Sequence, residues 1–447
     1  MITPSDDTIY ARASGAGKAG VAVYRLSGPQ SHPIVSQLVG KQINIRSADY
    51  AIIRDPVTSA VIDQGLAILF KGPASFTGGD VAELHLHGSR AVEMSLFETL
   101  SAMGARPAEA GEFTYRALRG GKLDLAQVEA LADLIDSETS LQRMQALGQL
   151  GGQLSELAQG WRAQLLAVLA PLEADIDFPD EGDVPAAVAA HAGPAIDQLK
   201  DELTIFLTDS GRARMIREGL DIAIIGPPNA GKSSLLNALA GSDVAIVSDT
   251  PGTTRDVIET RLNLNGMLAN LADTAGLRAA GDDAIEAEGM ARARARAGSA
   301  DIRILVLDPE EGGSAEMLGL LRKGDILVWS KADLGRAIPA LSLARDIQAI
   351  EISSKNGSGI DALLNVLTSA TDNEASADGP ALTRARHVHA VKDAFDALTR
   401  AHKNITLAPE LAAEDARMAV RALGSITGAV GVEDILGEIF SSFCIGK

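Results

Sequence analysis

Residues 220–240 read LDIAIIGPPNAGKSSLLNALA, and this segment sets the architecture of the middle of the chain. An apolar run from Leu220 to Ile225 leads directly into a glycine-rich loop and then into a helix-favouring segment. The loop GPPNAGKS, Gly226 to Ser233, matches G-x-x-x-x-G-K-[ST] at every position. Between a strand and a helix, such a loop wraps phosphate oxygens with backbone N–H groups. The segment therefore predicts an α/β domain with a phosphate-binding loop.

Two side chains of this loop fit nucleotide chemistry. We expect Lys232 to neutralise the terminal phosphates and the Ser233 hydroxyl to bind Mg²⁺. A glycine turn without a ligand is the alternative, and the flanking strand and helix argue against it. The loop residues expected to contact the nucleotide are Asn229, Ala230, Gly231, Lys232, Ser233 and Ser234.

Two further elements follow at the spacing of a nucleotide-binding unit. DTAG, Asp273 to Gly276, comes after an apolar run, and its carboxylate and glycine N–H suit Mg²⁺ and the γ-phosphate. TPGTTRD begins at Thr250, and a threonine there can close on Mg²⁺ only while the γ-phosphate is present. The expected nucleotide contacts are Ser248, Asp249, Thr250, Pro251, Gly252, Thr253, Thr254, Asp273, Thr274, Ala275 and Gly276.

The base-reading loop is expected after the apolar run DILVW, residues 325–329. Asp333 of the SKAD segment can accept hydrogen bonds from the ring N–H and the exocyclic amine of guanine, which adenine does not offer. The SSK segment after the last strand would back this loop. An ATPase would require Asp333 to be incidental, and the serine in place of an amide leaves nucleotide affinity open. The expected base-side residues are Ser330, Lys331, Asp333, Ser353, Ser354 and Lys355.

On both sides of this unit the sequence pattern changes. Residues 1–118 mix short β-like runs with glycine-rich turns, which is typical of an α+β domain. Residues 119–217 and 379–447 show helical periodicity. Apolar runs alternating with helical stretches in residues 218–378 predict a parallel sheet covered on both faces. The α/β unit is therefore expected to be inserted into a helical domain.

Composition excludes several classes of protein. The 447 residues carry a net charge of −19, which disfavours a general nucleic-acid coat protein. The single cysteine, Cys444, cannot form an intrachain disulfide. The first residues have no charged and apolar leader pattern, and no run is long enough to span a bilayer. We therefore expect a cytoplasmic protein without a membrane partner.

Several motifs together resemble one family. The loop variant with Asn229, the TTRD segment, DTAGLR and above all the terminal FCIGK are similar to the MnmE (TrmE) tRNA-modification GTPases. DTIYARASGAGKAGVAVYRLSG, SFTGGDVAELHLHG and GEFTYRALRGGKLDLAQVEALADLID also resemble that family, so the likeness covers nearly the whole chain. It implies an N-terminal α+β domain that binds folate and dimerises, a helical domain, and an inserted Ras-like P-loop G domain.

The resemblance also implies an activity and partners. Such a GTPase acts as a homodimer with the FAD-binding protein MnmG (GidA), in a heterotetramer. The complex adds an aminomethyl or carboxymethylaminomethyl group at C5 of the wobble uridine of tRNA. The one-carbon donor is 5-formyl- or 5,10-methylene-tetrahydrofolate.

The family's functional residues fall on specific positions here. Folate contacts fall on Arg25, Glu83, Lys122 and Lys447, and a catalytic role falls on Cys444. Arginine and lysine suit the carboxylates of a folate, and a carboxylate suits the donors of a pterin. Glu83, His85 and His87 alternate along one predicted strand, so a metal site is a weaker alternative to packing or ligand contact.

Hydrolysis needs a residue that orients water, and Leu277 stands where many GTPases have glutamine. The family assigns this role to the glutamate of an ExxG element, here Glu286, while Asp283 stays as a second candidate because the intervening loop is longer. The family uses K⁺ in place of an arginine finger. The resemblance implies Mg²⁺ at Ser233 and Thr254 and K⁺ at Asn229, Ser248, Thr250 and Thr253.

A second function class stays open. A regulatory GTPase switch, for example in ribosome assembly, would need the nucleotide loops but neither the folate residues nor the FCIGK end. These two features separate an enzyme from a switch.

Overall fold

The computed structural model describes residues 7–177, 185–246, 259–273, 297–313, 315–339, 347–372, 379–430, 439–440 and 446. The chain divides into two compact units. Unit 1 contains Met1–Ala132, Leu150–Lys200 and Asp393–Lys447, and unit 2 contains Asp133–Gln149 and Asp201–Lys392. Among the described residues, no helix is both long and apolar enough to cross a membrane.

The N-terminal part of unit 1 is a six-stranded sheet with the order β3-β4-β5-β2-β1-β6. Its strands alternate buried and open side chains, as the short β-like runs predict: in β5, Leu84 and Leu86 are buried while Glu83 and His85 lie on the other face. The buried face packs against Leu38 of α1 and other apolar residues of α1 and α2. The elements are β1 (Ile9–Arg12), β2 (Ala19–Ser27), α1 (Ser31–Val39), β3 (Asp49–Arg54), β4 (Val61–Phe70), β5 (Val81–Gly88), α2 (Arg90–Ala102), β6 (Arg106–Pro107) and α3 (Glu112–Arg119).

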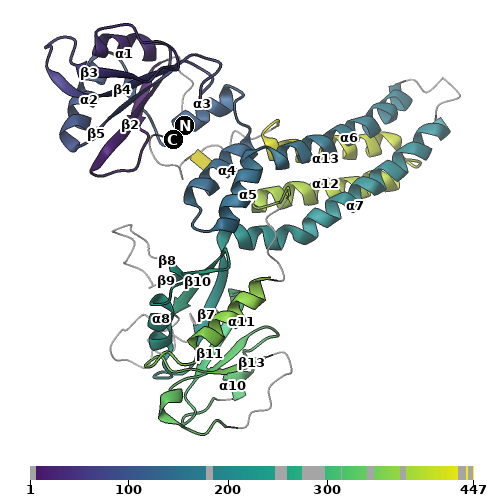
Figure 1. Ribbon diagram of the computed structural model, residues 1–447. Coiled ribbons are helices and arrows are strands. Elements are labelled where there is room, and N and C mark those ends of the chain that lie inside the picture. The colour runs from purple at the N-terminus through teal and green to yellow at the C-terminus, as the bar shows by residue number, and fades with distance from the viewer. Residues whose placement is uncertain are drawn as a thin grey trace, which may run out of the picture. The chain divides into compact units, whose positions relative to one another are not determined.

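Helices precede and follow the inserted domain, as the sequence predicts. In unit 1, α13 packs along α6 (Figure 1). Small side chains at helical spacing on α13, Ala412, Ala416 and Ala419, are fully buried and permit close approach. Arg417 of α13 donates to Glu173 of α6 at 2.8 Å. The helices are α4 (Leu125–Asp136), α5 (Ser140–Leu150), α6 (Gln153–Asp177), α7 (Pro185–Glu218), α12 (Ala385–Asn404) and α13 (Pro409–Thr427).

Unit 2 holds the P-loop domain, residues 220–372, around a seven-stranded sheet with the order β13-β12-β11-β7-β10-β9-β8. The strands β7, β10, β11, β12 and β13 are parallel, as expected. Two antiparallel strands, β8 and β9, extend the sheet beyond this expectation, because a tight turn at Asn265 and Gly266 joins β9 to β10 as a hairpin. The strands are β7 (Leu220–Ile225), β8 (Ala245–Ile246), β9 (Glu259–Leu264), β10 (Met267–Asp273), β11 (Ile302–Leu307), β12 (Ile326–Trp329) and β13 (Gln348–Glu351).

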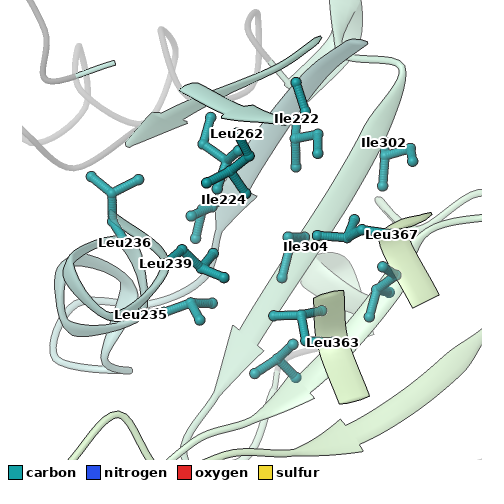
Figure 2. Close-up of a cluster of buried hydrophobic side chains, with 14 of the residues drawn as sticks. Ile222, Ile224, Leu235, Leu236, Leu239, Leu262, Ile302, Ile304, Leu363 and Leu367 are labelled. Atoms are coloured by element: carbon teal, nitrogen blue, oxygen red, sulfur yellow. The ribbon is translucent and has the colours of Figure 1, made fainter. Parts of the chain in front are cut away.

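The apolar strands of this sheet are covered on both faces. Helices α8 (Lys232–Ala240) and α11 (Ile360–Asp372) bury one face, where Leu235, Leu239 and Leu363 meet Ile224 and Ile304 (Figure 2). On the other face Leu305, Leu327 and Trp329 form a second cluster, against which α10 (Ala315–Leu318) packs. This burial fixes the strand ends that carry the site.

Candidate functional site

The backbone of the phosphate loop is shaped by three residues with positive φ. Gly226 has φ 148°, and a Cβ there would lie 2.2 Å from the Val306 carbonyl oxygen, so only glycine fits beside β11. Asn229 and Gly231 have φ 61° and 98°, in or near the left-handed region. The loop thus turns sharply from the end of β7 into the start of α8.

The ammonium of Lys232 lies inside this turn. Its Nζ donates to the carbonyl oxygens of Gly226 at 2.9 Å and Pro227 at 2.6 Å, and the residue is buried. Lys232 is also the first residue of α8, and the N-terminal end of a helix attracts anions. A positive charge and a helix N-terminus therefore converge on one spot, which suits a phosphate group.

The base-side loop begins at the end of β12. Ser330 is buried, and both its backbone N–H and its Oγ donate to the Leu307 carbonyl oxygen, at 2.9 and 3.2 Å. Ser353 Oγ donates to Asp333 Oδ1 at 2.8 Å. The parallel pairing of β12 with β13 therefore brings the SKAD and SSK segments together.

The phosphate loop and the base-side loop adjoin each other. A Cβ placed on Gly231 would lie 3.5 Å from Ser330 Cβ and 3.6 Å from its Oγ. Asp273 ends β10 and pairs in register with Ile224 of β7, so it lies at the same edge of the sheet. The carboxyl ends of parallel strands are the usual ligand edge of such a sheet.

Several predicted residues lie outside the described part of the chain. They are Ser248, Asp249, Thr250, Pro251, Gly252, Thr253, Thr254, Thr274, Ala275, Gly276, Asp283, Glu286, Cys444 and Lys447. Their assignments therefore stay predictions.

A second polar cluster lies on the open face of the N-terminal sheet. Arg25 and Glu83 are directly opposite in the β2–β5 register, and Arg25 Nε donates to Glu83 Oε1 at 2.9 Å. His85 Nε2 lies 3.3 Å from Glu83 Oε2. The Arg25 guanidinium lies 5.1 Å from the ring centre of Phe76 and 5.8 Å from that of Phe113.

Lys122 reaches the same loop that carries Phe76. A Cβ on Gly78 would lie 3.4 Å from Lys122 Cγ, and a Cβ on Gly120 would lie 2.6 Å from the Thr77 carbonyl oxygen. The loop and the segment before α4 therefore pack closely. Three of the four residues predicted to contact folate gather around this loop.

The C-terminal segment also reaches the N-terminal sheet. Gly446 has φ 101°, and a Cβ there would lie 1.9 Å from the Arg12 carbonyl oxygen and 3.2 Å from Ala13 Cα. This contact places Gly446 at the end of β1, next to the strand that carries Arg25. The position of Gly446 agrees with the expectation, implied by the family resemblance, that the C-terminal motif lies near Arg25. Sequence reasoning missed Phe76 and Phe113 as neighbours of Arg25, because no local pattern marks contacts between distant segments.

The alternating residues of β5 do not form a metal site. Glu83 bonds to Arg25, whereas His87 Nδ1 pairs with Asp63 Oδ1 at 2.9 Å. In the part of the chain that the structure describes, no group of three or more His, Cys, Asp or Glu side chains could hold a metal ion.

Two family models match this chain. The "GTP-binding protein TrmE N-terminus" model matches residues 8–122, and the "MnmE helical domain" model matches residues 125–444. The protein of Parvibaculum lavamentivorans named tRNA modification GTPase MnmE is 49% identical over 99% of this chain and 100% of its own length. The proteins of the same name from Maricaulis maris and Caulobacter vibrioides are 48% and 47% identical, over 98% and 99% of this chain and 99% and 100% of theirs.

Among solved structures, the G domain of the T. maritima FeoB iron transporter is similar, with a TM-score of 0.27 and 28% identity. The match covers 34% of this chain and 99% of the FeoB G-domain chain. A variant of Aquifex aeolicus Era bound to GDP and AlF4⁻ has a TM-score of 0.26 and 25% identity, over 40% of this chain and 66% of its own.

Proposed function

We propose, because the chain belongs to the MnmE (TrmE) family of tRNA modification GTPases, that its GTP hydrolysis serves folate-dependent modification of the wobble uridine. The product would carry an aminomethyl or carboxymethylaminomethyl group at C5. The observation that carries this proposal is the pair of clusters described above, one around Lys232 and one around Arg25.

The nucleotide residues fit GTP and Mg²⁺. Lys232 supplies positive charge inside the loop, and Ser233 follows it in the first turn of α8, where a hydroxyl can bind Mg²⁺ together with Thr254. Asp333, held by Ser353, presents the carboxylate that reads guanine. Asp273 ends β10 at the same edge of the sheet, and its carboxylate would support the metal.

Hydrolysis would use residues on both sides of the phosphates. Glu286 would orient the attacking water, with Asp283 as the second candidate. K⁺ would be held by Asn229 together with Ser248, Thr250 and Thr253. Asn229 lies in the phosphate loop with φ 61°, and its side-chain amide oxygen is an acceptor that could bind a cation.

The N-terminal cluster fits a folate. Arg25 pairs with a carboxylate and lies near the half-buried ring of Phe76, so the cluster offers a cation, an acceptor and one accessible aromatic ring, while Phe113 is fully buried beneath it. Lys122 adds a second cation beside the Phe76 loop. A bound 5-formyl- or 5,10-methylene-tetrahydrofolate would supply the one-carbon unit. Lys447 and Cys444 would complete the site, because Gly446 docks at the neighbouring strand.

The assembly we propose is a homodimer that joins MnmG (GidA), which carries FAD, in a heterotetramer on tRNA. Large apolar side chains remain exposed on the open face of the N-terminal sheet: Tyr50 at 60%, Ile52 at 40% and Leu66 at 38%. Such a patch is typical of a subunit interface. The net charge of −19 disfavours broad tRNA contact by this chain alone, so the partner would bring much of the basic surface.

Mass analysis of wobble uridines tests this proposal. Cells that lack the protein should lose the C5 group, and the unmodified gene should restore it. A gene with Arg25→Ala should fail to restore it although GTP hydrolysis persists. If the wobble uridines are the same with and without the protein, the regulatory switch is the better description.

A further inference from the structure

A buried carboxylate behind the base-side loop belongs to none of the motifs described above. Asp308 follows β11 directly, and its side chain is 2% exposed. Its Oδ2 accepts from Lys331 Nζ at 2.6 Å, and its Oδ1 accepts from Arg336 Nη1 at 2.8 Å. The backbone N–H of Glu310 donates to Oδ1 at 3.0 Å.

These contacts keep Asp308 charged despite its burial. Burial alone would raise its pKa, but the hydrogen bonds from Lys331, from the Glu310 backbone and from Arg336 hold the pKa at about 2. A charged carboxylate with several donors is a rigid anchor, because each donor it loses leaves buried charge less well satisfied.

The two cations that Asp308 holds stand on either side of Asp333. Lys331 precedes the short 3-10 turn Ala332–Leu334, and Arg336 follows it after one glycine. Lys331 has φ 58° and ψ 35°, a left-handed backbone that is unfavourable for a lysine and needs such an anchor. Both ends of the turn are therefore bonded to one carboxylate, which directly follows the neighbouring strand β11.

These contacts with Asp308 matter because the side chain at position 330 is short and extends little beyond the backbone. The short Ser330 side chain bonds back to the Leu307 carbonyl oxygen, on the strand that Asp308 follows. The base-side loop is therefore bonded at three points to Leu307 and Asp308, at the end of β11. We infer that Asp308 and Arg336 are positioning residues for guanine recognition, which hold the turn so that Asp333 faces the base; this inference rests on the proposed reading of guanine by Asp333.

The affinity ratio of GDP to IDP tests this inference in the full-length protein. IDP lacks the exocyclic amine, so the ratio reports how well the Asp333 carboxylate is placed, and a general loss of folded protein leaves it unchanged. Competition against a fluorescent guanine nucleotide gives both affinities. Arg336→Ala and Asp308→Asn should each lower the ratio by about fivefold, the equivalent of one hydrogen bond. Arg336→Lys should restore part of it.

Arg322→Ala is the matched control, because Arg322 is an exposed arginine of the same domain outside the base-side loop, and it should leave the ratio unchanged. If Asp333→Asn lowers the ratio while Arg336→Ala and Asp308→Asn do not, the inference is wrong and the guanine reading stands. An unchanged ratio in Asp333→Asn would instead refute the guanine reading.

Discussion

The P-loop domain and the N-terminal sheet each carry a candidate ligand site, and the two are built differently. Around Lys232, the backbone of one contiguous loop sets the geometry, and the Lys232 ammonium donates to carbonyl oxygens of that loop. Around Arg25, side chains from two strands, a loop and a distant segment meet, with Glu83 lying 58 residues away in sequence. The first site depends on residues that are close in sequence, whereas the second depends on contacts between segments that are distant in sequence.

The largest effect should come from removing the central charge of the site around Lys232. Lys232→Ala leaves the loop without its ammonium, and we expect GTP turnover to fall by on the order of 10³-fold. Phosphate-release assays would measure the rate. Folate binding by the same variant should be unchanged, and a parallel loss of folate binding would show that the two sites are not separate.

A single methyl group should disrupt the site around Arg25. Gly446→Ala would place a Cβ 1.9 Å from the Arg12 carbonyl oxygen, so the backbone at Gly446 or at Arg12 must shift. We expect tRNA modification to fall by on the order of 100-fold, as expected for displaced catalytic groups, with GTP turnover retained. Gly160→Ala is the control, because a Cβ there has no neighbour within 4 Å. Full modification by Gly446→Ala would rule out a role for this contact.

Low pH should destabilise the N-terminal part of the chain, because it protonates Glu112, whose side chain is 1% exposed. Burial alone would raise its pKa, but Arg106, the Glu109 N–H and Arg116 hold the pKa below the ordinary 4.5. A lowered pKa contributes stability above pH 4.5, and that stability is lost as the pH falls through the folded pKa. Glu112→Gln should therefore cost on the order of 2 kcal/mol at pH 7.

Thermal unfolding at several pH values measures this difference in stability. The gap between the unmodified protein and Glu112→Gln should narrow as the pH falls below 4.5. Glu98→Gln, at an exposed position of α2, should show no such gap. A stability difference that stays constant from pH 7 to pH 3 would mean that the charge of Glu112 contributes nothing to the free energy of unfolding.

The smallest effect concerns the serine of the base-side loop. An amide at position 330 would lie beside Gly231 and could add a hydrogen bond between the two loops. We expect Ser330→Asn to tighten GDP binding by about 1 kcal/mol, which equilibrium titration can resolve. No tightening would mean that the Ser330 bond to the Leu307 carbonyl already fills this role.

The contrast also explains what the sequence could predict. The phosphate loop was recognisable because Gly226 and Lys232 lie within seven residues of each other and because strand and helix flank them. Its spatial link to Asp333 followed from the rule that parallel strands end at one edge. The alternation of β5 likewise predicted that Glu83 and His85 share a face.

Contacts between distant segments could not be predicted in this way. Nothing near Phe76 or Phe113 indicates that their rings lie against Arg25, because that contact depends on how a loop and a helix fold over the sheet. The family resemblance implies that the C-terminal motif lies near Arg25, but it does not indicate that Gly446 contacts the Arg12 carbonyl. The antiparallel hairpin of β9 and β10 was missed because the alternation of apolar runs with helical stretches predicts only parallel strands.

Crossed ligand titrations would establish whether the chain carries two separate sites for two ligands. Calorimetry would measure the affinity of a tetrahydrofolate and of GDP for the unmodified protein and for the variants Arg25→Ala and Lys232→Ala. The control variant is Arg90→Ala, which changes an exposed residue of α2. We predict that Arg25→Ala weakens folate binding by about tenfold or more and leaves GDP binding unchanged, since it removes a charge-assisted contact. Lys232→Ala should weaken GDP binding and leave folate binding unchanged. Folate binding by Arg25→Ala that matches the unmodified protein would show that the cluster around Arg25 is not the folate site.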